Sequence, residues 1–183
     1  QDNLSGETKT SKEIVALPTK SINSIASTTA GIYQKDEGDT MKIINQLSKG
    51  VPLIVEDTDL TPNSAQAYSV GDLITGYGVA VAILHYYNIY GGDVKGKKVI
   101  VQGWGNVAGA AAYYLAQSGA IITGIIDKAG GVINPQGYTF EEIKSLLENR
   151  SSNFLEAENM LPFEKVNEKI WSIGAEIFVP AAA

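Results

Sequence analysis

The segment at residues 99–120, VIVQGWGNVAGAAAYYLAQSGA, constrains the fold of this chain more than any other part of the sequence. The block rich in Val and Ile over 97–102 predicts a buried strand, which runs directly into a glycine cluster. Gly103 and Gly105 allow a tight turn and a close approach of the backbone to a phosphate. The alanine-rich residues that follow predict a helix, with Gly119 at its C-terminal end. This order is typical of a dinucleotide-binding unit, although the same glycines could simply turn a strand into a helix.

The elements expected after this segment alternate between strands and helices. Strands are predicted at 121–126 and 175–180, and helices at 139–149 and 162–174. Thr139 followed by Glu142 is a capping-box pattern that marks the start of a helix. Residues 130–137, GGVINPQG, are predicted to be turns. The alternation predicts an α/β fold, a Rossmann-type doubly wound parallel sheet with helices on both faces.

The region before the glycine turn is harder to interpret. A helix is predicted at 71–90, a short strand at 51–56 and another helix at 39–50. We expect residues 71–183 to form the dinucleotide-binding domain. Residues 1–70 would be an N-terminal piece of uncertain structure, either a linking segment or part of a substrate domain. Because the last predicted strand ends the sequence, we expect the sheet to be truncated there and the chain to be a fragment.

An acid stands where the second strand ends. Asp127 follows the glycine turn at the distance expected of a residue that accepts hydrogen bonds from the adenosine ribose. Its carboxylate would repel a 2′-phosphate, which favours NAD. Lys128 beside it could attract that phosphate, so NADP stays possible. The alternative is that Asp127 is a solvated loop acid.

Composition excludes several classes of function. Hydrophobic residues make up 44% of the chain, enough for a packed core. The formal charge of −6 and the lack of a long basic run argue against nucleic-acid binding. With no Cys and a single His, His85, a metal site is not expected. No apolar run of about 18 residues and no signal pattern occur, so we expect a cytoplasmic protein without membrane helices.

Four ordered motifs resemble the cofactor domain of the Glu/Leu/Phe/Val amino-acid dehydrogenases, the family of glutamate dehydrogenase. They are ITGYGVAVA at 74–82, VQGWGNVAGAAAYYLAQSGA at 101–120, IIDKAGGVINPQG at 125–137 and FVPAAA at 178–183. The resemblance covers about residues 74–183.

The resemblance implies a set of cofactor-binding residues: Thr75 and Asn106 at the nicotinamide carboxamide, Gly103, Gly105, Asn106 and Val107 around the pyrophosphate, Asp127 at the adenosine ribose, and Ala181 and Ala182 along the wall. Lys128, next to Asp127, is a further candidate because its charge could attract a 2′-phosphate. Each has an alternative. Thr75 could begin a helix without touching a ligand, Asn106 could simply cap one, and the terminal alanines could be plain backbone.

The sequence also departs from the family pattern. Gly71 stands where the family has an Arg, and Leu73 where it has an acid. No G-G-x-K-G segment with a catalytic Lys occurs. Asp36 lies near the expected place of a catalytic Asp, but its context does not match and a solvated acid is favoured. The same holds for the loop acids of the 57–59 segment, so catalytic residues cannot be assigned.

The resemblance implies the oxidative deamination of an L-amino acid, glutamate or a branched-chain or aromatic one, to a 2-oxo acid by a full-length homo-oligomer. Because the catalytic Lys is missing, a non-catalytic NAD(P)-binding or assembly module stays open. Three further side chains are assigned from their surroundings. His85 is expected to be packed or on the surface, the Trp104 ring beside the cofactor, and Trp171 in the core.

Overall fold

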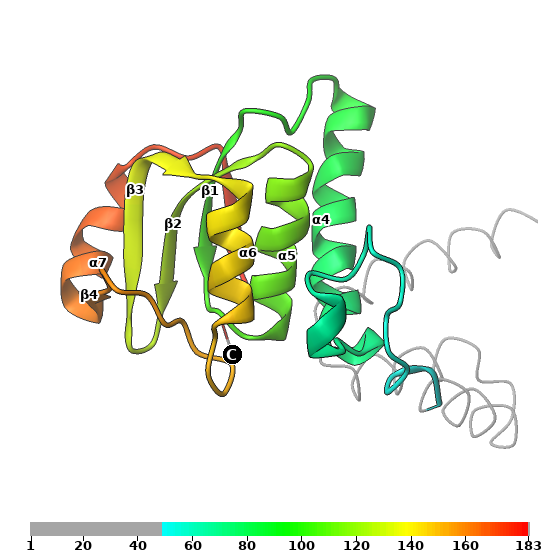
Figure 1. Cartoon of the computed structure of the whole chain (residues 1–183). Coiled ribbons are helices and arrows are strands. Elements are labelled where there is room, and N and C mark those ends of the chain that lie inside the picture. Colours follow the sequence, from blue (N-terminus) through cyan, green and yellow to red (C-terminus); the bar gives the residue numbers. More distant parts are fainter. Residues whose placement is uncertain (1–48, 183) are drawn as a thin grey trace, which may run out of the picture. The chain divides into compact units, whose positions relative to one another are not determined.

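The computed structural model describes residues 49–182 (Figure 1). These divide between two compact units, with 49–54 and 69–71 in one and 55–68 and 72–182 in the other. The helix predicted at 39–50 lies outside the described residues except for its last two positions, which are helical.

The strand predicted at 51–56 is wrong. Only Ile54 pairs there, in an isolated antiparallel bridge with Ser69. Pro52 has no N–H to donate, and the partner segment turns at once into helix α4 (Val70–Tyr90). The pairing therefore cannot extend into a ladder.

A five-stranded sheet carries the larger unit, in the order β4-β3-β2-β1-β5. Its strands are β1 (Lys98–Gln102), β2 (Ile121–Asp127), β3 (Gly130–Tyr138), β4 (Leu161–Pro162) and β5 (Ile177–Pro180). β1 pairs in parallel with both β2 and β5, whereas β3 is antiparallel to β2 and to β4. The predicted α/β fold is confirmed, but the sheet is mixed, with its parallel part at β2, β1 and β5.

The antiparallel strand β3 occupies the segment that was predicted to be turns. Asp127 pairs with Gly130, so Lys128 and Ala129 form a two-residue hairpin loop. The paired glycines permit close strand packing: a Cβ on Gly130 would collide with the carbonyl oxygen of Leu161, and one on the next glycine would collide with a carbonyl of β2. Glycines that look like turn formers in sequence are here required by close backbone contact.

The helices predicted after residue 70 are present, but the last one ends at Lys169, before its predicted end at 174, and a 3-10 turn follows it. They are α4, α5 (Asn106–Gln117), α6 (Phe140–Glu148) and α7 (Phe163–Lys169), with short 3-10 turns η2 (Ser64–Gln66) and η3 (Ile170–Ser172). α6 starts with the predicted Thr139–Glu142 capping box. α5 ends in a Schellman motif, in which Ala120 N donates to Leu115 O and Gly119, at φ +89°, donates to Ala116 O.

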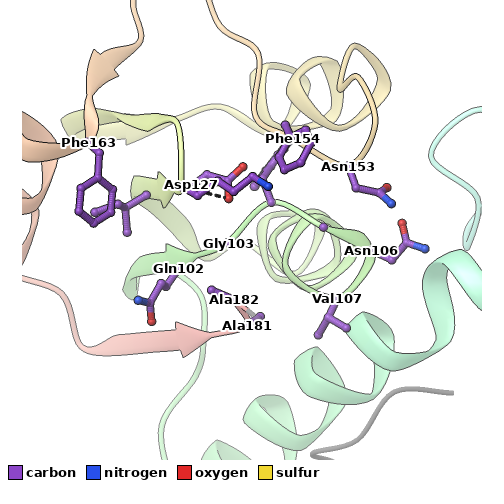
Figure 2. A pocket seen from close by; sticks show the side chains of 14 residues that line it. Gln102, Gly103, Asn106, Val107, Asp127, Asn153, Phe154, Phe163, Ala181 and Ala182 are labelled. Atoms are coloured by element: carbon purple, nitrogen blue, oxygen red, sulfur yellow. Dashed lines mark hydrogen bonds between the residues drawn. The ribbon is translucent and has the colours of Figure 1, made fainter. Parts of the chain in front are cut away.

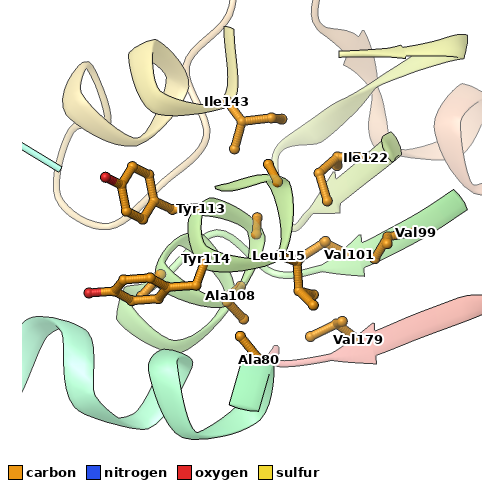
Figure 3. Close-up of a cluster of buried hydrophobic side chains, with 14 of the residues drawn as sticks. Ala80, Val99, Val101, Ala108, Tyr113, Tyr114, Leu115, Ile122, Ile143 and Val179 are labelled. Atoms are coloured by element: carbon orange, nitrogen blue, oxygen red, sulfur yellow. The ribbon is translucent and has the colours of Figure 1, made fainter. Parts of the chain in front are cut away.

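Helices cover both faces of the sheet, as a doubly wound fold requires. On one face Val99 and Val101 pack beneath α5 and α6 in the main core (Figure 3). On the other, Ile100 and Ile126 pack against α7 and η3. The alternation of β1 side chains between two apolar layers explains its near-continuous hydrophobic sequence.

Two side chains outside the site can be compared with their predictions. His85 is exposed, in agreement with the surface position foreseen for it. Trp171 is 49% exposed, so its predicted place in the core is wrong. It lies on η3, and its ring packs against Phe178 of the edge strand β5, with 5.3 Å between the ring centroids. Within residues 49–182 no helix has the length and apolarity needed to cross a membrane.

Candidate functional site

A pocket of about 480 Å³ lies at the carboxyl ends of β1, β2 and β5 (Figure 2). Open α/β sheets bind ligands in this crevice, and the volume lies within the range of about 300–1,000 Å³ typical of ligand sites. Eight of the predicted residues line it: Gly103, Gly105, Asn106, Val107, Asp127, Lys128, Ala181 and Ala182. The fold therefore brings together residues that are up to eighty positions apart in the sequence, whereas Thr75 is not among the lining residues.

The two glycines of the turn have different surroundings. Gly103 has φ +94°, and a Cβ there would lie 2.8 Å from the carbonyl oxygen of Ala181. Its N–H donates to Ile126 O at 2.7 Å, which ties the ends of β1 and β2 together. A Cβ on Gly105 would meet no atom within 4 Å. Gly103 is thus required by the fold itself, while Gly105 leaves open space beside the pocket.

The N-terminus of α5 begins at this open space. Gly105 is the N-cap and offers no side chain to the first-turn N–H groups, and the first helical bond runs from Gly109 N to Gly105 O at 2.9 Å. Such a helix end carries a partial positive charge and donors that favour an anion. Asn106 occupies the first helical position, so the alternative that it caps the helix is wrong.

The Asn106 side chain makes two hydrogen bonds to other elements. Its Nδ2 donates to Oδ1 of Asp72 on α4 at 3.0 Å, and its Oδ1 accepts from Nη2 of Arg150 at 2.8 Å. These partners are 34 and 44 residues away in the sequence, so no local sequence motif predicts them. Burial lowers the pKa of Arg150, and its Nη1 is buried without a hydrogen-bond partner.

Asp127 is half-buried and ordered by two backbone N–H groups. Oδ1 accepts from Lys128 N at 2.9 Å, and Oδ2 accepts from Leu155 N at 3.1 Å. Asp127 thereby fastens the loop after α6 to the end of β2, and it is more than a solvated acid. Each carboxylate oxygen keeps a further lone pair for a ligand. The Lys128 ammonium lies 4.0 Å from the ring centroid of Phe154, a pocket residue that sequence reasoning missed.

Trp104 differs from its predicted position. Its ring is fully buried in the main core, and Nε1 donates to Leu146 O of α6 at 3.2 Å. The residue borders the pocket, but its indole supports α6 from the inside. Its place between two glycines correctly predicts that the backbone of Trp104 lies at the turn. It does not predict the direction of the side chain, which points into the core.

Thr75 lies half-buried on α4, next to the point where this helix meets α5. A Cβ on Gly76 would approach the Val107 carbonyl oxygen at 2.6 Å and the Ala110 Cβ at 2.5 Å. Only glycine permits this close crossing of the two helices. The contact holds Thr75 near the first turns of α5, and its role in binding stays a prediction.

The remaining acids provide no recognisable catalytic group. Asp57 and Asp59 are exposed in a loop, where Oδ1 of Asp57 accepts from Asp59 N at 2.9 Å, in agreement with solvated loop acids. Asp36 lies outside the described residues. Among residues 49–182 no cluster of three or more His, Asp or Glu side chains could hold a metal ion.

Comparison with known proteins places this site in a family context. A family model described as Glutamate/Leucine/Phenylalanine/Valine dehydrogenase matches residues 70–183. A solved structure of a glutamate dehydrogenase point mutant aligns with a TM-score of 0.50 and 24% identity, over 86% of this chain and 34% of that one. This structural likeness concerns the fold alone.

Curated relatives match the same region. The glutamate dehydrogenase of Aeropyrum pernix is 38% identical over 109 residues, 59% of this chain and 25% of that protein. The NADP-specific glutamate dehydrogenase of Saccharolobus shibatae is 33% identical over 110 residues, 59% and 25% of the two chains. A cryptic catabolic NAD-specific glutamate dehydrogenase of Bacillus subtilis is 33% identical over 108 residues, 59% and 24%. This chain spans about a quarter of the length of the curated relatives it matches.

Proposed function

The chain belongs to the Glutamate/Leucine/Phenylalanine/Valine dehydrogenase family, and from this premise we propose that residues 71–183 form the dinucleotide-binding domain of an NAD(P)-dependent amino-acid dehydrogenase. Residues 1–70 would link to its substrate domain or belong to it. The observation that carries the proposal is the open space at Gly105, where the uncapped start of α5 meets a pocket at the carboxyl ends of three parallel strands.

The residues present fit a nicotinamide dinucleotide. The absent side chain of Gly105 leaves room for a pyrophosphate, and the N–H groups at Asn106 and Val107 would bind it. Asp127 would accept from the adenosine ribose with its free lone pairs. Ala181 would line the wall with its small side chain. When bound, the nicotinamide would accept the hydride, and these residues would hold the cofactor in place.

In the intact protein the proposed reaction transfers a hydride from Cα of an L-amino acid to the nicotinamide, and the amino group loses a proton, which gives an imine. Water then hydrolyses the imine to a 2-oxo acid and ammonia. The substrate is glutamate or a branched-chain or aromatic amino acid. The sequence contains no G-G-x-K-G segment that would supply the catalytic Lys, and no acid in it matches the family's catalytic Asp pattern. Gly71 and Leu73 replace an Arg and an acid that the family pattern places near Thr75.

The alternative function is a non-catalytic NAD(P)-binding or assembly module, favoured by the absence of a G-G-x-K-G segment. Calorimetry with NAD and NADP, beside an absorbance assay for reduced cofactor with a panel of L-amino acids, tests both. We expect the 183-residue chain to bind a dinucleotide without turnover. A folded chain that binds neither cofactor contradicts the proposal, and measurable turnover contradicts the view that catalytic groups lie outside the chain. Turnover by the full-length protein separates the enzyme from the module.

The choice of cofactor depends on Asp127 and Lys128. We propose NAD, because the Asp127 carboxylate repels a 2′-phosphate, while the curated relatives include both NAD- and NADP-specific enzymes. Asp127→Ser should weaken NAD binding about 10-fold and NADP binding clearly less, since it removes a ribose acceptor and a phosphate repellent together. The control is Asp93→Ser, because exposed Asp93 also accepts from a nearby backbone N–H at 2.9 Å. An equal loss for both cofactors means that Asp127 does not face the ribose.

Homo-oligomerisation of the full-length protein and its cytoplasmic location remain predictions. The C-terminal end of α4 exposes large apolar side chains, with Ile89 and Tyr90 at 72% and 74%, which supports contact with another subunit. Analytical ultracentrifugation of the full-length protein checks the assembly, and a monomer at micromolar concentration contradicts it.

A further inference from the structure

We propose that Asp72 and Arg150 are positioning residues that hold the Asn106 side-chain amide in one orientation for the nicotinamide end of the cofactor. The inference rests on the proposed function. The juxtaposition that carries it is a chain of two hydrogen bonds, from Arg150 Nη2 to Asn106 Oδ1 at 2.8 Å and from Asn106 Nδ2 to Asp72 Oδ1 at 3.0 Å.

The chemistry of the two partners determines which way the amide points. A carboxylate only accepts hydrogen bonds and a guanidinium only donates them. A flipped Asn106 would place its oxygen against Asp72 and its NH₂ against Arg150, and both bonds would be lost. The pair therefore distinguishes the two ends of the amide, which an isolated Asn at a helix start does not.

The two bonds leave half of the amide available. Asn106 Nδ2 has a second N–H, and Oδ1 has a second lone pair. A primary carboxamide offers the complementary acceptor and donor. Asn106 lines the pocket, so a fixed amide there suits the carboxamide of a nicotinamide better than a phosphate, whose oxygens only accept hydrogen bonds.

Both partners are held by packed elements. Asp72 lies in the first turn of α4, which is fastened to α5 by the close contact at Gly76. The Arg150 guanidinium lies over α5 at Gly109, where a Cβ would be 3.5 Å from Nη1. Its Nη1 is buried without a partner, so packing and the single bond to Asn106 define its place. The opposite charges of Asp72 and Arg150 flank a neutral amide, which keeps the local charge near zero.

The experiment compares binding of NAD with binding of ADP-ribose, which lacks the nicotinamide, by calorimetry on the whole chain. Arg150→Met and Asp72→Ala should each weaken NAD binding about 5- to 10-fold, the loss expected for one oriented hydrogen bond, and change ADP-ribose binding less than about 2-fold. Arg150→Lys and Asp72→Asn, which retain a donor and an acceptor, should recover part of the loss. Glu141→Ala, which removes an exposed first-turn acid from α6, is the matched control and should change neither.

Several outcomes overturn the inference. Equal losses for NAD and ADP-ribose mean a general structural role, and unchanged NAD binding in all four variants means no role. If the Met and Ala variants do not fold, the Lys and Asn variants are compared with the wild type. An unchanged ratio of NAD to ADP-ribose affinity in both then overturns the inference, and a lowered ratio supports it. A folded wild-type chain that binds neither ligand overturns the proposed function as well, whereas a wild type that binds both equally overturns the positioning alone.

Discussion

The first-turn N–H groups of helices α5 and α6 are treated differently: side chains cap those of α6, and no side chain caps those of α5. At α6, Thr139 Oγ1 accepts from Glu142 N at 3.2 Å, and Glu142 Oε2 accepts from Thr139 N at 2.7 Å. At α5, Gly105 caps the helix without any side-chain bond, and the space where a Cβ would stand is open. A closed set of hydrogen bonds stabilises α6, while no side chain of the cap residue bonds the first-turn donors of α5.

The two glycines of the turn, Gly103 and Gly105, have different structural reasons to be glycine. Gly103 has positive φ, and a Cβ there would collide with the backbone of Ala181. Only glycine therefore fits at this position between β1 and α5. Gly105 has φ −71°, which any residue adopts. Only its missing side chain matters, and it matters only if something occupies the space. Gly103 is therefore required by the fold, whereas the open space at Gly105 is what the proposed dinucleotide site needs.

The largest expected effect is on stability, from a change at Gly103 between β1 and α5. Gly103→Ala should lower the free energy of unfolding by about 3 kcal/mol or more, because it combines the cost of positive φ with a collision against Ala181. Gly96→Ala is the control, since Gly96 has φ +79° and no atom within 4 Å, and it should cost only about 1–2 kcal/mol. Urea denaturation measures both. Equal losses contradict the claim that backbone contact at Ala181 requires glycine.

The next effect gives α5 the kind of cap that α6 has. Gly105→Ser should weaken dinucleotide binding about 10- to 100-fold, because its hydroxyl takes a first-turn N–H and its bulk enters the open space, while stability changes by only a few tenths of a kcal/mol. Gly105→Ala adds bulk without an acceptor. It should also weaken binding, but it should be about 0.5–1 kcal/mol less stable than the Ser variant. Calorimetry and urea denaturation decide, and unchanged binding in both variants contradicts an open ligand site.

A smaller effect comes from opening the cap of α6. Thr139→Ala should destabilise the protein by about 1 kcal/mol, because Glu142 N loses its acceptor. It should leave dinucleotide binding unchanged, since Thr139 does not line the pocket. Thr139→Ser retains the hydroxyl and should restore most of the stability. If Thr139→Ala weakens binding as much as Gly105→Ser does, the two helix starts do not have separate roles.

The smallest effect is on pH dependence. Hydrogen bonds from the Thr139 backbone N–H and then from its hydroxyl lower the pKa of Glu142. A lowered pKa in the folded protein gives stability that is present above the unfolded pKa, near 4.5, and is lost as pH falls through the folded value. In the Glu142→Gln variant the free energy of unfolding should therefore fall less steeply as the pH drops below about 4.5. Urea midpoints from pH 3 to pH 6 check the slope, and identical slopes contradict the assignment.

Sequence patterns predicted the elements whose causes are local. The capping box at Thr139 and the glycine that ends α5 depend on neighbours a few residues apart, so their positions were confirmed. β3 was missed because its glycines resemble turn formers, and their real cause is contact with β2 and β4. Trp171 was misplaced because a large aromatic residue favours a core, while η3 holds this one beside the exposed edge strand.

By itself, the sequence determined a strand, a glycine turn and a helix, an acid at the end of the next strand, and the resemblance of these parts to a family. The tertiary structure alone decided which glycine leaves an open space and which is pressed against Ala181. It also decided that Asn106 lies between Asp72 and Arg150. The physical reason is that capping and turns depend on adjacent residues, whereas open volume and hydrogen-bond partners depend on atoms that folding brings together from distant parts of the chain.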